Sequence, residues 1–91
     1  MKKTVYIVFE EKYWKNTEYC DIVSVHATKE KAEERLVECK KEFQQEHAED
    51  IADIRENEYP CHEKDTECFY SFLDETMGFY YEVSIKVMDL D

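Results

Sequence analysis

Apolar and polar positions alternate in two stretches near the start of the chain, as they do in β-strands. The stretch TVYIVFE (4–10) has β-branched or aromatic side chains on both of its faces, which predicts a central strand buried on two sides. In YCDIVSVH (19–26), Val23 and Val25 alternate with polar residues and predict a second strand. The residues between the two stretches, EKYWKNTE (11–18), contain an Asn-Thr turn signal. We therefore expect a hairpin with a long, aromatic-tipped connection.

A helical period begins after the second stretch. Thr28 can cap exposed backbone N–H groups and Glu30 complements the positive helix N-terminus, so the helix is predicted to start near Lys29. Apolar positions then recur at steps of three or four, at Ala32, Leu36, Cys39, Phe43, His47, Ile51 and Ile54. A continuous helix reaching this far would be about 40 Å long, roughly twice the length of the predicted strands. It therefore either breaks near Gln45 to His47 or projects past the sheet.

The C-terminal segment FYYEVSIKVMDL (79–90) alternates cleanly and predicts a half-buried strand. Its predicted inward positions are Tyr81, Val83, Ile85 and Val87. The preceding CFYSFLDETMG (68–78) fits either a hairpin or a short helix capped by Gly78, and we favour the hairpin.

These elements predict one α+β domain spanning residues 1–91. With 91 residues, one Gly and one Pro, the chain has room for a single core. We expect a small antiparallel-rich sheet of three or four strands with one long helix packed on one face, in the order ββαββ or ββααβ. The helix should pack through Ala32, Leu36, Cys39 and Phe43.

Two segments carry a resemblance to a known group of proteins. VYIVFEEKYWKNTEYCDIVSVHATKEKAEERL (5–36) and GFYYEVSIKVMDLD (78–91) resemble small uncharacterised proteins of Firmicutes and their phages. The resemblance implies a ββαβ-type core, with a helix that opens on TKEKAEE, and a phage or mobile-element setting. It covers roughly half of the chain and its motifs are structural, so it assigns no functional residue.

The net charge of −11 is concentrated in the middle of the sequence. Residues 42–75 contain 12 acidic side chains against Arg55 and Lys64, a net charge of −10, whereas residues 1–41 have a net charge of +1. Negative charge opposes direct binding to nucleic acid or to an anionic membrane surface. We therefore expect a basic partner.

Six carboxylates of the predicted helix fall on one arc opposite its apolar stripe: Glu34, Glu38, Glu42, Glu49, Asp53 and Glu56. Several of them form like-charge i,i+4 pairs, and the last ones lie towards the negative end of the helix dipole, so local helix stability does not explain them. A second group, Glu63, Asp65, Glu67, Asp74 and Glu75, could extend this acidic surface. The arc is either a solvated face or a recognition surface that imitates the phosphates of a nucleic acid.

The pair Tyr13 and Trp14 offers a second candidate contact, because it falls in the predicted connection. Trp14 could fold back to cover an open end of the core. Alternatively, both rings could be exposed and serve as a binding hot spot.

No motif indicates catalysis, a metal site or a cofactor. The spacing of Cys61, His62 and Cys68 is not a standard zinc pattern, and the single Gly leaves no phosphate-binding loop. The apolar run 5–9 is too short for a signal peptide or a membrane span, so we expect a cytoplasmic protein with four reduced, metal-free thiols.

We therefore expect a small, non-enzymatic phage or mobile-element protein that inhibits a nucleic-acid-binding host protein, of the anti-CRISPR or anti-defence type, with the acidic arc as a nucleic-acid mimic. The alternative is an acidic structural or regulatory module that self-associates, for example as a homodimer, through its long helix.

Overall fold

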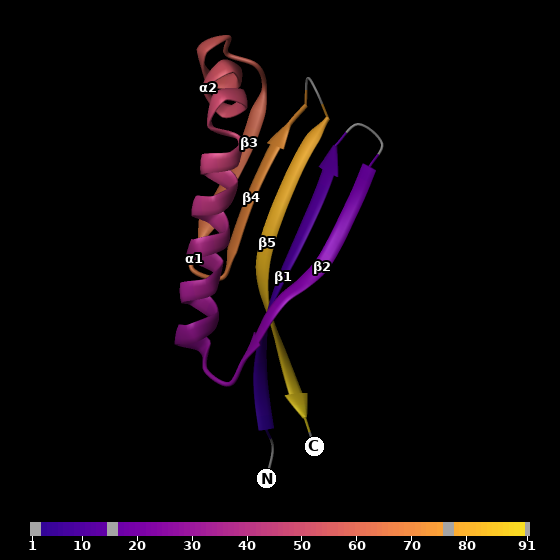
Figure 1. Cartoon of the computed structure of the whole chain (residues 1–91), viewed down its shortest axis with the longest axis vertical. Coiled ribbons are helices and arrows are strands. Elements are labelled where there is room, and N and C mark those ends of the chain that lie inside the picture. The colour runs from indigo at the N-terminus through magenta and orange to yellow at the C-terminus, as the bar shows by residue number, and fades with distance from the viewer. Residues whose placement is uncertain (1–2, 15–16, 76–77, 91) are drawn as a thin grey trace.

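The computed structural model describes residues 3–14, 17–75 and 78–90 and contains seven elements within them (Figure 1). These are β1 (Lys3–Trp14), β2 (Thr17–His26), α1 (Lys29–Glu46), α2 (Ala48–Glu56), β3 (Cys61–Thr66), β4 (Phe69–Asp74) and β5 (Phe79–Leu90). The strands form one antiparallel sheet in the order β2-β1-β5-β4-β3. Both helices lie on the same side of this sheet, and α2 lies at the opposite end of the molecule from the start of β1 and the end of β5 (Figure 1).

The predicted α+β class is confirmed, but the prediction of three or four strands with one long helix is wrong. The additional strand is β3, whose sequence CHEKDT has no apolar alternation. It becomes a strand by pairing with β4 along its whole length, from Cys61 opposite Asp74 to Thr66 opposite Phe69. An edge strand that is largely exposed can be polar on both faces, which removes the signal that sequence patterns use.

The single long helix is replaced by two helices that meet at His47. The start is as predicted, since Thr28 caps α1 by accepting from the backbone N–H of Lys31. His47 adopts φ −113° and ψ 24°, and α2 then turns away from the axis of α1 (Figure 1). Of the two possibilities left open by the sequence, the break is the one found. It allows Ile51 and Ile54 to turn back into the core instead of projecting past it.

Both predicted hairpins form, but the connection of the first one is not as predicted. The predicted β4–β5 hairpin is confirmed, with Asp74 paired to Phe79 and Gly78 at φ +69°. The long connection predicted between the first two strands is wrong, because β1 continues to Trp14, which pairs with Thr17 at the start of β2. Residues 15–16 and 76–77, which include the predicted Asn-Thr turn signal in part, lie outside the described residues.

The core fills the space between the sheet and the helices. Val8, Phe72 and Val83 are fully buried on the inner face of the sheet, and the ring of Phe43 from α1 stacks on that of Tyr81 at a centroid distance of 4.1 Å. The predicted helix contacts Ala32, Leu36, Cys39 and Phe43 are all buried.

Two predictions of burial fail because the helices cover only part of one face. β1 was expected to be buried on both sides, yet Ile7 and Phe9 alternate with Val8 and lie on the face opposite the helices. Val87 was predicted to point inward, but it is 64% exposed because β5 extends past the region that α1 covers.

Candidate partner-binding surface

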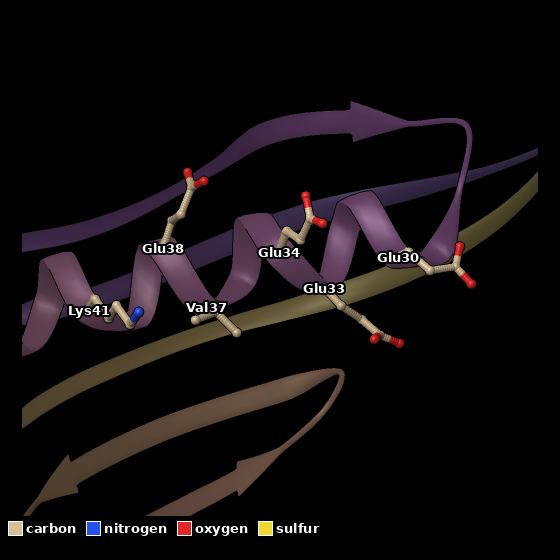
Figure 2. Close-up of a pocket in the computed structure, with 6 residues that line it drawn as sticks. All are labelled: Glu30, Glu33, Glu34, Val37, Glu38 and Lys41. Carbon is tan, nitrogen blue, oxygen red and sulfur yellow. The ribbon is translucent and has the colours of Figure 1, made fainter.

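The acids of α1 lie on its outer face and are accompanied by bases. Figure 2 shows Glu34 and Glu38 projecting from one side of the helix and Glu30 and Glu33 from another, so their carboxylates diverge. Glu38 accepts from Arg35 at 2.8 Å. Glu34 lies 3.7 Å from the ammonium of Lys31. The N-terminal part of this helix face is therefore close to charge balance.

Glu42 is the third arc residue on α1. It lies 3.6 Å from Arg35, which thus faces two carboxylates at once. The hydrogen bond to Glu38 raises the pKa of Arg35 further, so this guanidinium stays charged. A partner would have to compete with Arg35 for both acids.

The acids of α2 form a separate group. Glu49, Asp53 and Glu56 are exposed on the side of α2 opposite Ile51 and Ile54. Among the residues that the structure describes, no Lys or Arg forms an ion pair with any of these three carboxylates. We name Glu49, Asp53 and Glu56 the acidic α2 surface.

The break at His47 separates the six arc residues predicted from the sequence. Because α2 leaves the axis of α1, Glu34, Glu38 and Glu42 do not continue in line into the acidic α2 surface (Figure 1). The structure thus divides the arc into one partly neutralised group and one that keeps its charge.

Of the second acidic group, Glu63 and Asp65 are exposed but form contacts to other side chains of the same chain. Glu63 accepts from the hydroxyl of Tyr70 at 2.6 Å and lies 3.4 Å from Arg55, while Asp65 pairs with Lys40. Burial, and next the hydrogen bond to Glu63, raises the pKa of Tyr70 well above its usual range. The polar edge strand β3 thus forms an ion pair with α1 through Lys40 and another with α2 through Arg55.

A third acid of this group, Glu67, is exposed between β3 and β4. It lies outside both strands and outside the ion pairs that hold β3. The prediction is wrong for Asp74, which is fully buried beneath the helices, and Glu75 lies within hydrogen-bond distance of His62, at 3.0 Å. Of the five residues predicted to extend the acidic surface, Glu67 is the one that the structure leaves for a partner.

Tyr13 and Trp14 do not act as a pair, since consecutive strand residues point to opposite faces of a sheet. Trp14 packs edge-on against Phe79 at 4.9 Å and covers one end of the core beneath α2. Tyr13 is 43% exposed on the face away from the helices. Trp14 therefore covers an end of the core, as one alternative predicted, whereas Tyr13 is the exposed ring that the other alternative predicted.

The hydroxyl of Tyr81 and the thiol of Cys39 are buried in the core. The hydroxyl of Tyr81 donates to Glu10 at 2.6 Å, and burial followed by this hydrogen bond raises its pKa far above its usual value. Burial likewise raises the pKa of the Cys39 thiol, which disfavours the reactive thiolate. Sequence reasoning missed the contact between Glu10 and Tyr81, because 71 positions separate the two residues and no local pattern links them.

No group of three or more His, Cys, Asp or Glu side chains that could hold a metal ion occurs in the described part of the chain. Over the same residues, no helix has the length and apolar character needed to cross a membrane. The four cysteines form no disulfide.

Comparison of the chain with known protein families, with curated proteins and with solved structures gives no match.

Proposed function

We propose that this chain is a non-catalytic binding protein that uses the acidic α2 surface to occupy a basic, nucleic-acid-binding surface on a protein partner. The observation that carries the proposal is the concentration of charge: residues 42–75 have a net charge of −10, and Glu49, Asp53 and Glu56 project from α2 without basic partners among the described residues. Binding of this kind would compete with nucleic acid for the partner.

The spacing of these acids supports the proposal. Glu49, Asp53 and Glu56 recur at intervals of four and three residues, which places a carboxylate about every 5 to 6 Å along the helix axis. Phosphates follow one another at about 3.4 Å along each strand of duplex DNA. The carboxylates are sparser than phosphates, but the helix holds them in a fixed line that a row of Lys and Arg side chains can follow.

The position of Glu56 opposes local stability, which favours a role in binding, whereas Glu49 lies in the first turn of α2, where the helix dipole favours an acid. Glu56 is the last residue of α2, where the helix dipole is negative and a cation would be preferred. Asp53 and Glu49 form a like-charge i,i+4 pair, which destabilises a helix by about 0.2–0.5 kcal/mol.

The resemblance to small proteins of Firmicutes and their phages suggests the more specific form of this proposal. In that setting the protein would inhibit a host defence protein, of the anti-CRISPR or anti-defence type. The alternative of self-association through the far end of a long helix has lost its structural basis, because Ile51 and Ile54 are buried within the chain.

The test is a triple charge reversal, Glu49→Lys, Asp53→Lys and Glu56→Lys, with a matched control of the same charge change, Glu34→Lys, Glu38→Lys and Glu42→Lys. Both variants would be used beside the unmodified protein to capture partners from bacterial lysate. We expect capture of a nucleic-acid-binding protein, its loss in the α2 variant and its retention in the α1 variant.

Two further readouts sharpen the test. Elution by high salt and by duplex DNA is expected, because the contact is electrostatic and the partner surface is shared with nucleic acid. Circular dichroism should show both variants folded, with α2 relieved of repulsion. Capture that survives both the α2 reversal and high salt would refute the proposal.

A further inference from the structure

The sheet face opposite the helices, here named the uncovered face, is unusually apolar for a face in contact with water. Six of its side chains, from four strands, are Ile7, Phe9, Ile22, Val25, Phe69 and Met88. Of these, Ile22 is 53% exposed and Val25 is 55% exposed. An antiparallel sheet with one solvated face normally alternates apolar and polar residues, and large exposed apolar patches mark interaction sites. The two-sided apolar pattern of residues 4–10 thus implies a second covering layer that one copy of the chain does not supply.

The chain as a whole exposes more area than a compact monomer of its mass. The chain exposes 6434 Å². A compact monomer of its mass, 11.1 kDa, exposes about 5,700 Å². The excess, about 700 Å², is close to the roughly 800 Å² that each partner buries in a stable interface. The radius of gyration of 14.8 Å also exceeds the value of about 12 Å expected for a compact domain of this length.

Charge indicates which partner fits this face. Among its described residues, Lys3, Lys64 and Lys86 balance Glu11, Glu18 and Glu82, although the chain as a whole carries −11. The acidic α2 surface lies on the helix side of the molecule (Figure 1). A second copy of the chain can therefore approach the uncovered face without the repulsion that the net charge would cause elsewhere.

We propose that the uncovered face is a homodimer interface, in which two copies pack sheet against sheet with their helices outward. Glu82, Ser84 and Lys86 follow one another on this face of β5, two residues apart. A two-fold axis that crosses the strands at Ser84 places Glu82 of each copy against Lys86 of the other. The same axis places Phe9, which pairs with Ser84, near its own symmetry mate.

The arrangement also explains why two carboxylates face each other on adjacent strands. Glu11 lies directly opposite Glu82, an unfavourable cross-strand pair in one copy of the chain. In the dimer, Lys86 of the second copy approaches this pair and compensates its charge. Within one copy Lys86 lies over the ring of Phe9, 4.3 Å from its centroid, and already attracts Glu82 electrostatically.

The test measures the mass of the intact chain by sedimentation equilibrium up to about 0.2 mM, where association with a free energy near −5 kcal/mol becomes detectable. We expect twice the chain mass of 11.1 kDa. Ile22→Lys should raise the dissociation constant at least about tenfold, because it buries a charge in the interface. Val37→Lys, a matched change on the outer face of α1 where Val37 is 44% exposed, should leave it unchanged.

A charge exchange tests the two-fold arrangement. Lys86→Glu alone should weaken the dimer, Lys86→Glu combined with Glu82→Lys should restore it, and Lys41→Glu on α1 should have no effect. If circular dichroism shows Ile22→Lys to be unfolded, Met88→Lys takes its place, since Met88 is 50% exposed on the same face. A monomer at 0.2 mM, a dimer that Ile22→Lys and Met88→Lys leave intact, or no restoration by the exchange overturns the proposal. The triple reversal on α2 should remain dimeric, so the two proposals fail independently.

Discussion

Replacing Phe43 with Ala should destabilise the protein more than replacing any other residue of α1 with Ala. The ring is 2% exposed and lies at the centre of the core, stacked on Tyr81 at 4.1 Å and 4° and on Phe79 at 5.7 Å and 9°. It also meets the rings of Tyr70 and Phe72 at 6.1 and 6.0 Å. One substitution therefore removes contacts to both β4 and β5.

The magnitude follows from the lost volume and the lost ring contacts. A buried Phe→Ala change costs about 3–5 kcal/mol, and stacked aromatic pairs contribute about 0.5–1.5 kcal/mol each beyond their buried area. We therefore expect a loss of about 4–5 kcal/mol for Phe43→Ala. A domain of 91 residues has a free energy of unfolding of about 5–14 kcal/mol. The variant should melt at least about 15 °C below the unmodified protein.

Urea unfolding followed by circular dichroism measures this change, with thermal melting as a second assay. Phe43→Leu should lose less, because it keeps most of the volume while removing the ring stacking. Val37→Ala on the exposed side of α1 should stay within about 0.5 kcal/mol of the unmodified protein. A loss below about 1 kcal/mol for Phe43→Ala would show that the ring cluster is not the centre of the core.

Two further predictions concern titratable side chains. Burial is the main cause that raises the pKa of Tyr70, Tyr80 and Tyr81 in the folded protein, and it raises that of Tyr80 to about 12. Above about pH 10 these hydroxyls therefore stay protonated in the folded protein but ionise in the unfolded chain. The free energy of unfolding should therefore be unaffected by them below about pH 10 and fall as the pH rises above it, and equal urea midpoints at about pH 8 and pH 11 would contradict this. The exposed thiols of Cys20 and Cys68 should react quickly with a thiol reagent, and the buried thiol of Cys39 should react only after unfolding. Mass spectrometry of the folded protein measures the labelling, and labelling of Cys39 as fast as that of Cys20 would contradict its burial.

Those parts of the fold that bury one clear face could be predicted from the sequence. Leu36 and Phe43 lie on a stripe of helical period, and Tyr81 and Val83 alternate with polar residues, so local patterns contained the information needed. β3 could not be predicted because its residues show no apolar alternation, and its strand state depends on pairing with β4 and on side-chain contacts to Lys40 and Arg55 in the two helices. A pattern of apolar and polar positions does not record such contacts.

The helix break shows a second limit. His47 lies on the same stripe as Phe43 and Ile51, so the apolar period continues through the break without a change of phase. Only the length of the helix relative to the sheet indicated that a turn was needed. The acidic arc was divided for the same reason, since a helical wheel assumes one straight axis.

The order of the strands concentrates the entropic cost of folding in one place. β1 pairs with β2, β3 with β4 and β4 with β5, and each of these contacts joins neighbours in the sequence. The contact between β1 and β5 alone unites strands from opposite ends of the chain, bringing together residues as distant as Lys3 and Leu90. Closing it restricts nearly the whole chain at once, because loop-closure entropy grows with the number of residues enclosed. The two halves of the sheet can thus form locally and early, and the pairing of β1 with β5 is the later step that fixes the topology of the sheet.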